Sequence, residues 1–187
     1  MKVVAGFIPP YRSERCIEHY LPASAAEHSE VYQFITFETL LLDHCRFRQW
    51  TRMLSGDVHY RMVFCPVEHD APVPGTPPLQ ALVQHDHASL CRRVGELADS
   101  PARGPGSPTQ CRRLITNLSV SSAVHGKFET ISYVLMSYAS AESPGGKFCT
   151  VERHDRLCRA GRMLRIERRE VLLHWNAQEL AQMPIIV

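Results

Sequence analysis

The chain has 187 residues, a length that suits one domain with a full hydrophobic core. A hydrophobic content of 44% and a formal net charge of +2 are ordinary for a globular protein, and the arginines are scattered in pairs rather than gathered in a stripe, which argues against nucleic acid as a partner. The apolar runs are too short for a membrane span, and Pro9 and Pro10 interrupt the start before it could form a secretory signal. We therefore expect a cytoplasmic protein.

Seven cysteines are present, and no two of them form a Cys-x-x-Cys pair. Zinc ribbons and fingers need two ligands close in sequence, because a tight turn must present both to one tetrahedral ion. We therefore expect free thiols, several of which pack as small hydrophobic groups.

Residues 1–23 contain three prolines and predict an extended arm ahead of a single domain that covers residues 24–187. Ser24 and Glu27 have the spacing of a capping box, in which the hydroxyl and the carboxylate each satisfy a backbone N–H at a helix start. The helix that begins there is expected to run to about Cys45. With these bounds, the apolar residues of the segment lie mostly on one face of the helix.

A second helical pattern starts near Phe47 and is expected to stop at Gly56 and Asp57. Alternation from Val58 to Phe64 predicts a short strand, the only one expected in the first half of the chain. Five prolines between positions 66 and 78 then predict a loop.

A third helix is expected to begin near a cap at Asp86 and to bury Leu90, Val94 and Leu97. After a loop over residues 99–109, strands are predicted near 111–121, 127–140, 147–158 and 162–174, with turns at 123–126, 143–146 and 159–161. Helices first and an antiparallel meander last indicate the α+β class. Long strands in a strongly curved, mostly antiparallel sheet, with about three helices packed on it, give a cone rather than a sandwich.

Few residues suggest metal or nucleotide chemistry. His85-Asp86-His87 could present two imidazoles to one ion only from a strand or bent loop, and here the trio precedes a helix, so we expect Asp86 to act as a cap. His125 and His174 have no orienting carboxylate next to them, and Ser121-Ser122 lies in no nucleophile elbow. The glycines form neither a phosphate-binding loop nor a dinucleotide fingerprint.

Acid–base catalysis is the other possibility, because a carboxylate, imidazole or phenol facing the cavity of a cone can act as a general base. The residues that could line such a cavity are Asp43, Tyr60, Asn117, Tyr133 and His154. The structural interpretation is stronger: Asp43 would cap or turn the chain before Arg46, and the tyrosines would be core residues with a satisfied hydroxyl. We assign no catalytic, cofactor-binding or metal-binding residue to the chain.

Two arginine pairs, Arg112-Arg113 and Arg168-Arg169, fall on predicted strands, so each pair should split between the two faces of the sheet. One member of each pair would face solvent or a partner, and the other would need a carboxylate. The candidates for that carboxylate are Glu152, Glu167 and Glu170.

Five segments occur in a particular order: Leu41-Leu42-Asp43 with Arg46-Phe47 and Trp50; Asp57 to Tyr60; the helix from Asp86 to Leu97 with Arg93 and Val94; Arg113 to Asn117; and Arg165 to Leu173. This succession spans roughly residues 25–187 and resembles the small (beta) subunit of Rieske-type aromatic-ring-hydroxylating dioxygenases. The proline-rich loop after Phe64 and the ending Gln182 to Val187 depart from the family pattern, which bears on contacts with a partner rather than on the fold.

The resemblance implies the cone fold shared with nuclear transport factor 2, ketosteroid isomerase and scytalone dehydratase. It also implies a subunit without a cofactor, assembled with a large alpha subunit that holds a Rieske iron–sulfur cluster and a mononuclear iron, commonly as three alpha and three beta chains. The Cys-x-His and Cys-x-x-His pairs that together bind a Rieske cluster are not both present here. We expect the N-terminal arm and the apolar end at residues 184–187 to pack on neighbouring chains, either in a trimer of this chain or on the large subunit.

Two alternatives remain at this stage: a stand-alone isomerase or dehydratase that uses the cavity, and a small-ligand-binding protein of the same fold. Both need an open cavity, and an enzyme needs convergent acid and base groups there as well. A structural subunit can fill that space with large side chains, for which the candidates are Phe128, Val134, Leu135, Met136, Met163, Leu164 and Ile166.

Overall fold

The computed structural model describes residues 21–64, 81–100, 110–123, 126–140 and 143–173. In chain order the elements are α2 (Ala25–Asp43), α3 (Phe47–Trp50), the 3-10 turn η2 (Thr51–Met53), β1 (Leu54–Phe64), β2 (Ala81–His85), α4 (His87–Asp99), β3 (Gln110–Ser122), β4 (Phe128–Ser140), β5 (Ser143–Ala160) and β6 (Met163–Leu173). The predicted arm up to residue 20, the loop at 66–78 and the chain end lie outside the described residues.

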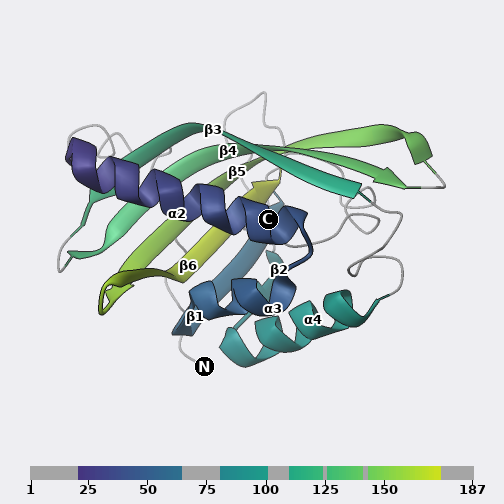
Figure 1. The fold of residues 1–187 in the computed structure, drawn as a ribbon, viewed down its shortest axis with the longest axis horizontal. Coiled ribbons are helices and arrows are strands. Elements are labelled where there is room, and N and C mark those ends of the chain that lie inside the picture. Colours follow the sequence, from purple (N-terminus) through teal and green to yellow (C-terminus); the bar gives the residue numbers. More distant parts are fainter. Residues whose placement is uncertain (1–20, 65–80, 101–109, 124–125, 141–142, 174–187) are drawn as a thin grey trace, which may run out of the picture.

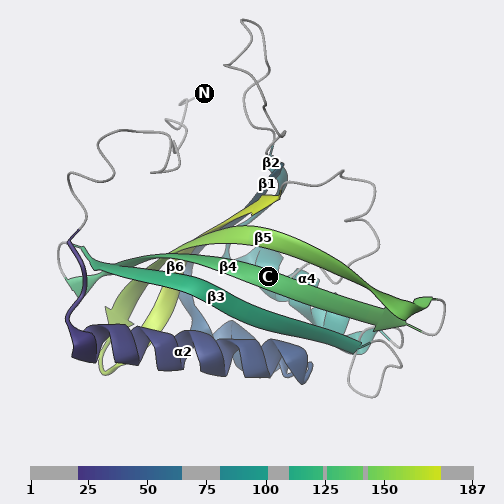
Figure 2. The same cartoon turned by 90° about the horizontal axis from the view of Figure 1, so that it is seen from above.

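Within these ranges, six strands form one mixed sheet in the order β2-β1-β6-β5-β4-β3. Strand β1 runs parallel to β6, and every other neighbouring pair is antiparallel. The sheet curves strongly, with α2 lying along one face and α3 and α4 beside β1 (Figures 1 and 2). The predicted α+β cone is confirmed.

Helix α2 begins at the residue that the capping box predicts. The Ser24 hydroxyl accepts a hydrogen bond from the Glu27 backbone N–H at 3.3 Å, and the Glu27 carboxylate accepts one from the Ser24 N–H at 2.9 Å. Just before the helix, Pro22 pairs with Ser121 of β3, with the Ala23 N–H bonded to the Val120 carbonyl at 3.1 Å. The start of α2 is therefore tied to the edge of the sheet.

Three predictions about the helices and strands are wrong. The second helix ends at Met53, and β1 starts at Leu54 and continues through Gly56, because Leu54 is buried and pairs with Ile166 of β6. Strand β2 was not predicted; it has five residues and lies at the sheet edge, where sequence signals are weak. The expected turn at 143–146 belongs to β5, and Gly146 adopts a positive φ of 69° there, next to a register shift in the β4–β5 ladder.

The core lies between the helices and the sheet. Helix α4 is capped by Asp86 and buries Leu90, Val94 and Leu97, as predicted. Of the seven residues proposed to fill the interior of the cone, five are buried. The prediction is wrong for Met163, which is 63% exposed at the start of β6. It is also wrong for Leu135, which is only partly buried because it points to the other face of β4. No helix in the described part of the chain has both the length and the apolar character needed to cross a bilayer.

Candidate functional site: the interior beneath α2

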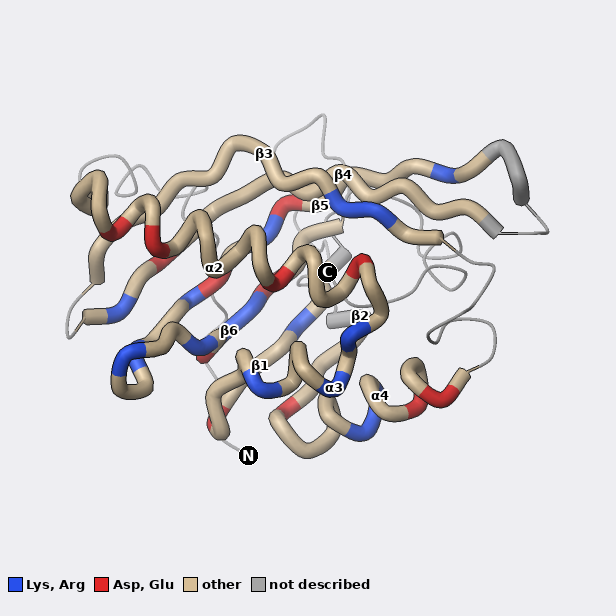
Figure 3. Tube along the Cα trace, in the orientation of Figure 1, with Lys and Arg blue, Asp and Glu red and all other residues tan. Residues whose placement is uncertain are grey.

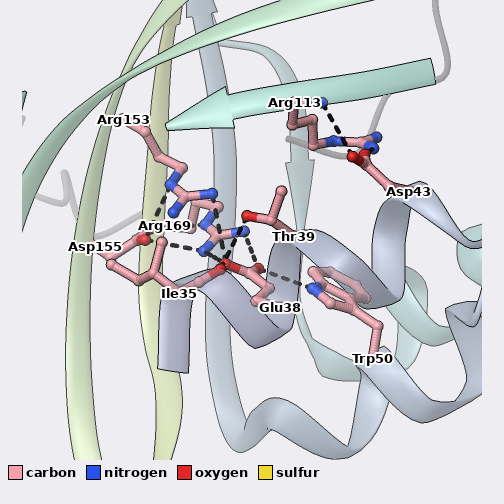
Figure 4. A network of polar contacts seen from close by, with 9 residues as sticks. All are labelled: Ile35, Glu38, Thr39, Asp43, Trp50, Arg113, Arg153, Asp155 and Arg169. Carbon is pink, nitrogen blue, oxygen red and sulfur yellow. Dashed lines mark hydrogen bonds and ion pairs between the residues drawn. The ribbon is translucent and has the colours of Figure 1, made fainter. Parts of the chain in front are cut away.

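A charged residue of α2 lies at the centre of the interior. Glu38 is completely buried, although it shares one helical stripe with the apolar Val31, Ile35 and Leu42. Its carboxylate accepts a hydrogen bond from the Trp50 indole N–H of α3 at 2.8 Å, and it is held by the guanidinium group of Arg169 on β6 through bonds of 2.5 and 2.9 Å (Figure 4). Glu38 therefore connects α2 to both α3 and the sheet.

Strand β5 supplies the other half of this network. Arg169 also donates to both carboxylate oxygens of Asp155, at 2.7 and 2.9 Å. Arg153 lies 3.1 Å from Asp155 and 3.5 Å from Glu38, distances that make ion pairs (Figure 4). Two arginines and two carboxylates thus balance to zero net charge in a place without solvent, which is the condition under which buried charge is tolerated.

The network favours the charged forms of Glu38 and Arg169. Burial by itself would raise the pKa of Glu38, but the charges of Arg169 and Arg153 and the hydrogen bonds outweigh it and lower that pKa to about 2. Burial also opposes the charge on Arg169, yet Asp155 and Glu38 raise the pKa of that guanidinium. A carboxylate this acidic is a poor proton acceptor near neutral pH, so the geometry suits a structural cross-link better than a general base.

Arg153 is held less completely than Arg169. Burial and the repulsion from Arg169 lower the pKa of Arg153, more than its attraction to Asp155 and Glu38 can offset. Its Nη2 atom, like the hydroxyl oxygens of Thr130 and Ser132 on the adjacent strand β4, is buried and has no hydrogen-bond partner in the part of the chain that the structure describes. This end of the network is polar and only partly satisfied.

A second buried ion pair lies at the C-terminal end of α2. The Asp43 carboxylate accepts hydrogen bonds from the Arg113 guanidinium at 2.6 Å and from the Arg113 backbone N–H at 3.2 Å (Figure 4). The Arg113 and Asp43 side chains are only 2% and 9% exposed. The expectation that Asp43 acts locally is therefore wrong: because α2 packs on β3, its carboxylate reaches a residue 70 positions later in the chain.

The residues proposed to line a cavity do not converge. Tyr60 is buried in the same core cluster as Ile35 and Trp50. Asn117 is exposed, with a φ of 52°, at an irregularity of β3. Tyr133 is 45% exposed on β4, so the prediction that it is a core residue is wrong. His154 alternates with Arg153 and so lies on the opposite face of β5, where it is 2.6 Å from Glu152.

Both arginine pairs split between the sheet faces as predicted, with Arg113 and Arg169 buried under α2. Their predicted carboxylates are wrong: the partner of Arg113 is Asp43 of α2, and the partners of Arg169 are Glu38 of α2 and Asp155 of β5. Of the three proposed carboxylates, Glu152 pairs with His154, Glu167 with Lys127 at 2.6 Å and Glu170 with Arg61 at 3.2 Å.

The two histidines of the possible metal site His85-Asp86-His87 belong to different elements. His85 ends β2 and His87 begins α4, while the Asp86 carboxylate accepts the Ser89 N–H at 2.8 Å, as predicted for a cap. Within the described ranges, no three His, Cys, Asp or Glu side chains lie close enough to hold a metal ion.

Five of the cysteines are described, and all five are free thiols; burial raises the pKa of Cys149 to about 11. His125 and His174 lie outside the described residues.

Sequence reasoning overlooked Glu38, Arg153 and Asp155. A usable signal was present: Glu38 interrupts the apolar stripe of α2, and Arg153 and Asp155 occupy the same face of β5 as the buried Val151 and Leu157. Charges at core positions of two separate elements indicate that those elements face each other.

A family model described as ring hydroxylating beta subunit matches residues 37–177. The 3-phenylpropionate/cinnamic acid dioxygenase subunit beta of Photorhabdus laumondii subsp. laumondii is 33% identical over 96 residues, which are 50% of this chain and 53% of that protein. The aligned part thus spans about half the length of that curated relative.

Two solved structures have a similar fold. One is naphthalene 1,2-dioxygenase with indole bound in its active site, with a TM-score of 0.73 and 17% identity over 87% of this chain and 89% of that chain. The other is the beta subunit of the benzoate 1,2-dioxygenase from Burkholderia mallei, with a TM-score of 0.65 and 15% identity over 84% of this chain and 94% of that chain. At these identities the likeness concerns the fold alone.

Proposed function

The chain belongs to the family of ring hydroxylating beta subunits, and from that premise we propose that it is the non-catalytic structural beta subunit of a multicomponent Rieske non-haem iron dioxygenase. In this proposal a large alpha subunit holds the Rieske cluster and the mononuclear iron and cis-dihydroxylates an aromatic compound in the cytoplasm. The beta chain contributes no cofactor and supports its partner.

The observation that carries the proposal is the buried network around Glu38. A cone-fold isomerase or dehydratase needs a general base that is free to accept a proton, in a cavity that substrate can enter. Here the carboxylate at the centre of the interior is already bonded to Trp50 and Arg169 and has a pKa of about 2. This favours a supporting role over the alternative of a stand-alone enzyme.

The outer face of α2 supports a working state with a partner. Phe37 and Leu40, three positions apart, are neighbours on that helix and are 54% and 51% exposed. Tyr32, about two turns before Leu40, is 54% exposed as well. Figure 2 shows that one side of α2 faces away from the sheet. Adjacent apolar side chains left in water are typical of a protein–protein contact surface.

A second apolar surface lies on the opposite face of the sheet. Leu114 of β3, Tyr133 of β4 and Phe148 of β5 are 53%, 45% and 58% exposed, and the strand register places them on the face away from α2. Two separate apolar surfaces suit a chain that has two kinds of neighbour. We infer contacts both with the large subunit and with other copies of this chain, in a complex of three alpha and three beta chains.

Co-expression with the large subunit tests the proposal. Light scattering should detect a mixed hexamer, and that hexamer should oxidise an aromatic acid; 3-phenylpropionate and cinnamate are the first substrates to try, because they name the dioxygenase of the curated relative. Phe37→Glu should weaken assembly, because it places a charge among the exposed apolar side chains. Ser29→Glu, which adds the same charge at an exposed position of α2 about two turns away, should not.

A stable monomer that ignores the large subunit would refute this function. The stand-alone enzyme would replace it if the isolated chain isomerised or dehydrated a small carbonyl compound and Asp43→Asn abolished that activity without unfolding the chain.

A further inference from the structure

An open groove of about 590 Å³ lies where three parts of the chain meet at one end of the cone. The corner between η2 and β1, the first turns of α4, and the β5–β6 hairpin each contribute to it. The lining residues are Thr51, Arg52, Leu54, Ser55, Gly56, His87, Cys91, Ala160 and Arg165. Two of these are arginines, and none is acidic.

Neither arginine of the groove has an acidic partner among the described residues, although Arg165 is half-buried. Other arginines of the same hairpin and strand are paired: Arg159 binds Glu30 through two bonds of 2.7 and 2.8 Å, and Arg169 is held by two carboxylates. Figure 3 shows basic residues both on the β5–β6 hairpin and beside α3. The groove thus holds two guanidinium groups, from different elements, that form no ion pair among the described residues.

The carboxylates next to the groove are already engaged. Asp57 accepts the Ser55 hydroxyl, and Asp86 caps α4 through Ser89. Glu167, two residues after Arg165, is bound to Lys127 at 2.6 Å. No other acidic residue lies within two positions of a lining residue in the sequence.

The remaining lining groups determine what the groove can hold. The hydroxyl groups of Thr51 and Ser55 are polar, but they already donate to the Arg48 carbonyl and the Asp57 carboxylate. The donors left for a ligand are therefore the two guanidinium groups and the His87 imidazole. Leu54, Ala160 and Cys91 provide apolar contact, and burial raises the pKa of the Cys91 thiol, which keeps that sulfur uncharged. Guanidinium groups recognise carboxylates through paired N–H donors, and a mixed lining of this size suits an organic anion better than a bare inorganic ion.

We propose that this groove is a binding site for an organic carboxylate, with Arg52 and Arg165 as its anion-recognising residues. The inference does not rest on the proposed function, because every lining residue belongs to this chain. The carboxylate can come from a small molecule or from an acidic side chain of a neighbouring subunit, and the two sources are separable by experiment.

Isothermal titration of the purified full chain, in the oligomeric state that it adopts, tests the site with benzoate as the probe and the neutral benzamide as its matched analogue. Benzoate should bind and benzamide should not. Arg52→Gln and Arg165→Gln should each weaken benzoate binding about tenfold or more, the loss expected for one charged hydrogen bond.

Arg162→Gln is the control, because it removes the same charge from an exposed residue of the same hairpin that does not line the groove. Its benzoate affinity should stay within about twofold of the native value, since a charge outside the site is screened by solvent. In amide-shift mapping of the native chain, which needs no variant to fold, benzoate should perturb Ser55, Gly56 and His87. The absence of benzoate binding, equal binding of benzamide, or an equal loss in Arg162→Gln would each overturn the site.

The same titration on the complex with the large subunit identifies the source. If benzoate affinity is retained in the complex and still falls in Arg165→Gln, the natural ligand is a small carboxylate. If the native complex no longer binds benzoate at this groove and the two arginine variants weaken its assembly, the carboxylate belongs to the neighbouring subunit.

Discussion

The interior beneath α2 and the groove beside α4 use arginine in opposite ways. Under α2, Arg169 makes four hydrogen bonds to Glu38 and Asp155 and has no access to solvent. In the groove, Arg52 and Arg165 line an open volume and have no acidic partner among the described residues. Charge that is fully paired inside the protein can hold elements together but cannot bind a ligand, whereas unpaired charge at an open surface can.

This difference predicts very different sensitivities to substitution. Removing one member of a buried ion network leaves an uncompensated charge in a place that water cannot reach, which is costly. Removing a charge at an open surface changes stability little, because solvent already screens it.

Glu38→Gln should produce the largest loss. The substitution leaves Arg153 and Arg169 with only Asp155 to balance two buried positive charges, so the free energy of unfolding should fall by about 3–5 kcal/mol. Urea denaturation followed by circular dichroism measures this. A loss below about 1 kcal/mol would mean that the network does not hold α2 on the sheet.

Acid should remove the same contribution from the native chain. Because the folded pKa of Glu38, about 2, lies below its ordinary value of 4.5, this carboxylate stabilises the fold above pH 4.5 and loses that contribution as the pH falls towards 2. The amount is roughly 3 kcal/mol. Urea midpoints measured across this range should therefore converge for the native chain and Glu38→Gln; parallel curves would contradict the assignment.

Asp43→Asn should have an intermediate effect. The amide can still accept one hydrogen bond from Arg113 but no longer neutralises that buried guanidinium, so unfolding should become easier by about 1–3 kcal/mol. Assembly should change more than any turnover of the chain alone. Thermal unfolding, with Asn117→Asp as an exposed control, measures the effect.

Glu30→Gln should have the smallest effect. Its partner Arg159 is 37% exposed, and a partly exposed pair of this kind contributes about 0–1 kcal/mol. The same urea experiment applies, and added salt should reduce the difference further. A loss as large as that of Glu38→Gln would remove the distinction between buried and exposed pairs on which the comparison depends.

Local sequence patterns were sufficient for most of the secondary structure. The capping box at Ser24, the cap at Asp86 and the alternation of the last four strands depend on residues a few positions apart, so the sequence alone predicted α2, α4 and the meander. Strand β2 was not predicted from the sequence, because it is short and pairs with β1 along only one of its edges. The succession of segments over residues 25–187 was enough to indicate the family, which the match over residues 37–177 confirms.

The partners of the charged residues were decided by the tertiary structure. The sequence predicted that one member of each arginine pair turns inward, because alternate residues of a strand face opposite sides of the sheet. Only the structure shows that these members are Arg113 and Arg169. The sequence could not say that Asp43 and Glu38 would meet them, since these contacts join positions 70 and 131 residues apart and depend on how α2 packs across the curved sheet. The groove has the same origin: Arg52 and Arg165 become neighbours only because β1 runs parallel to β6, which brings the η2–β1 corner beside the β5–β6 hairpin.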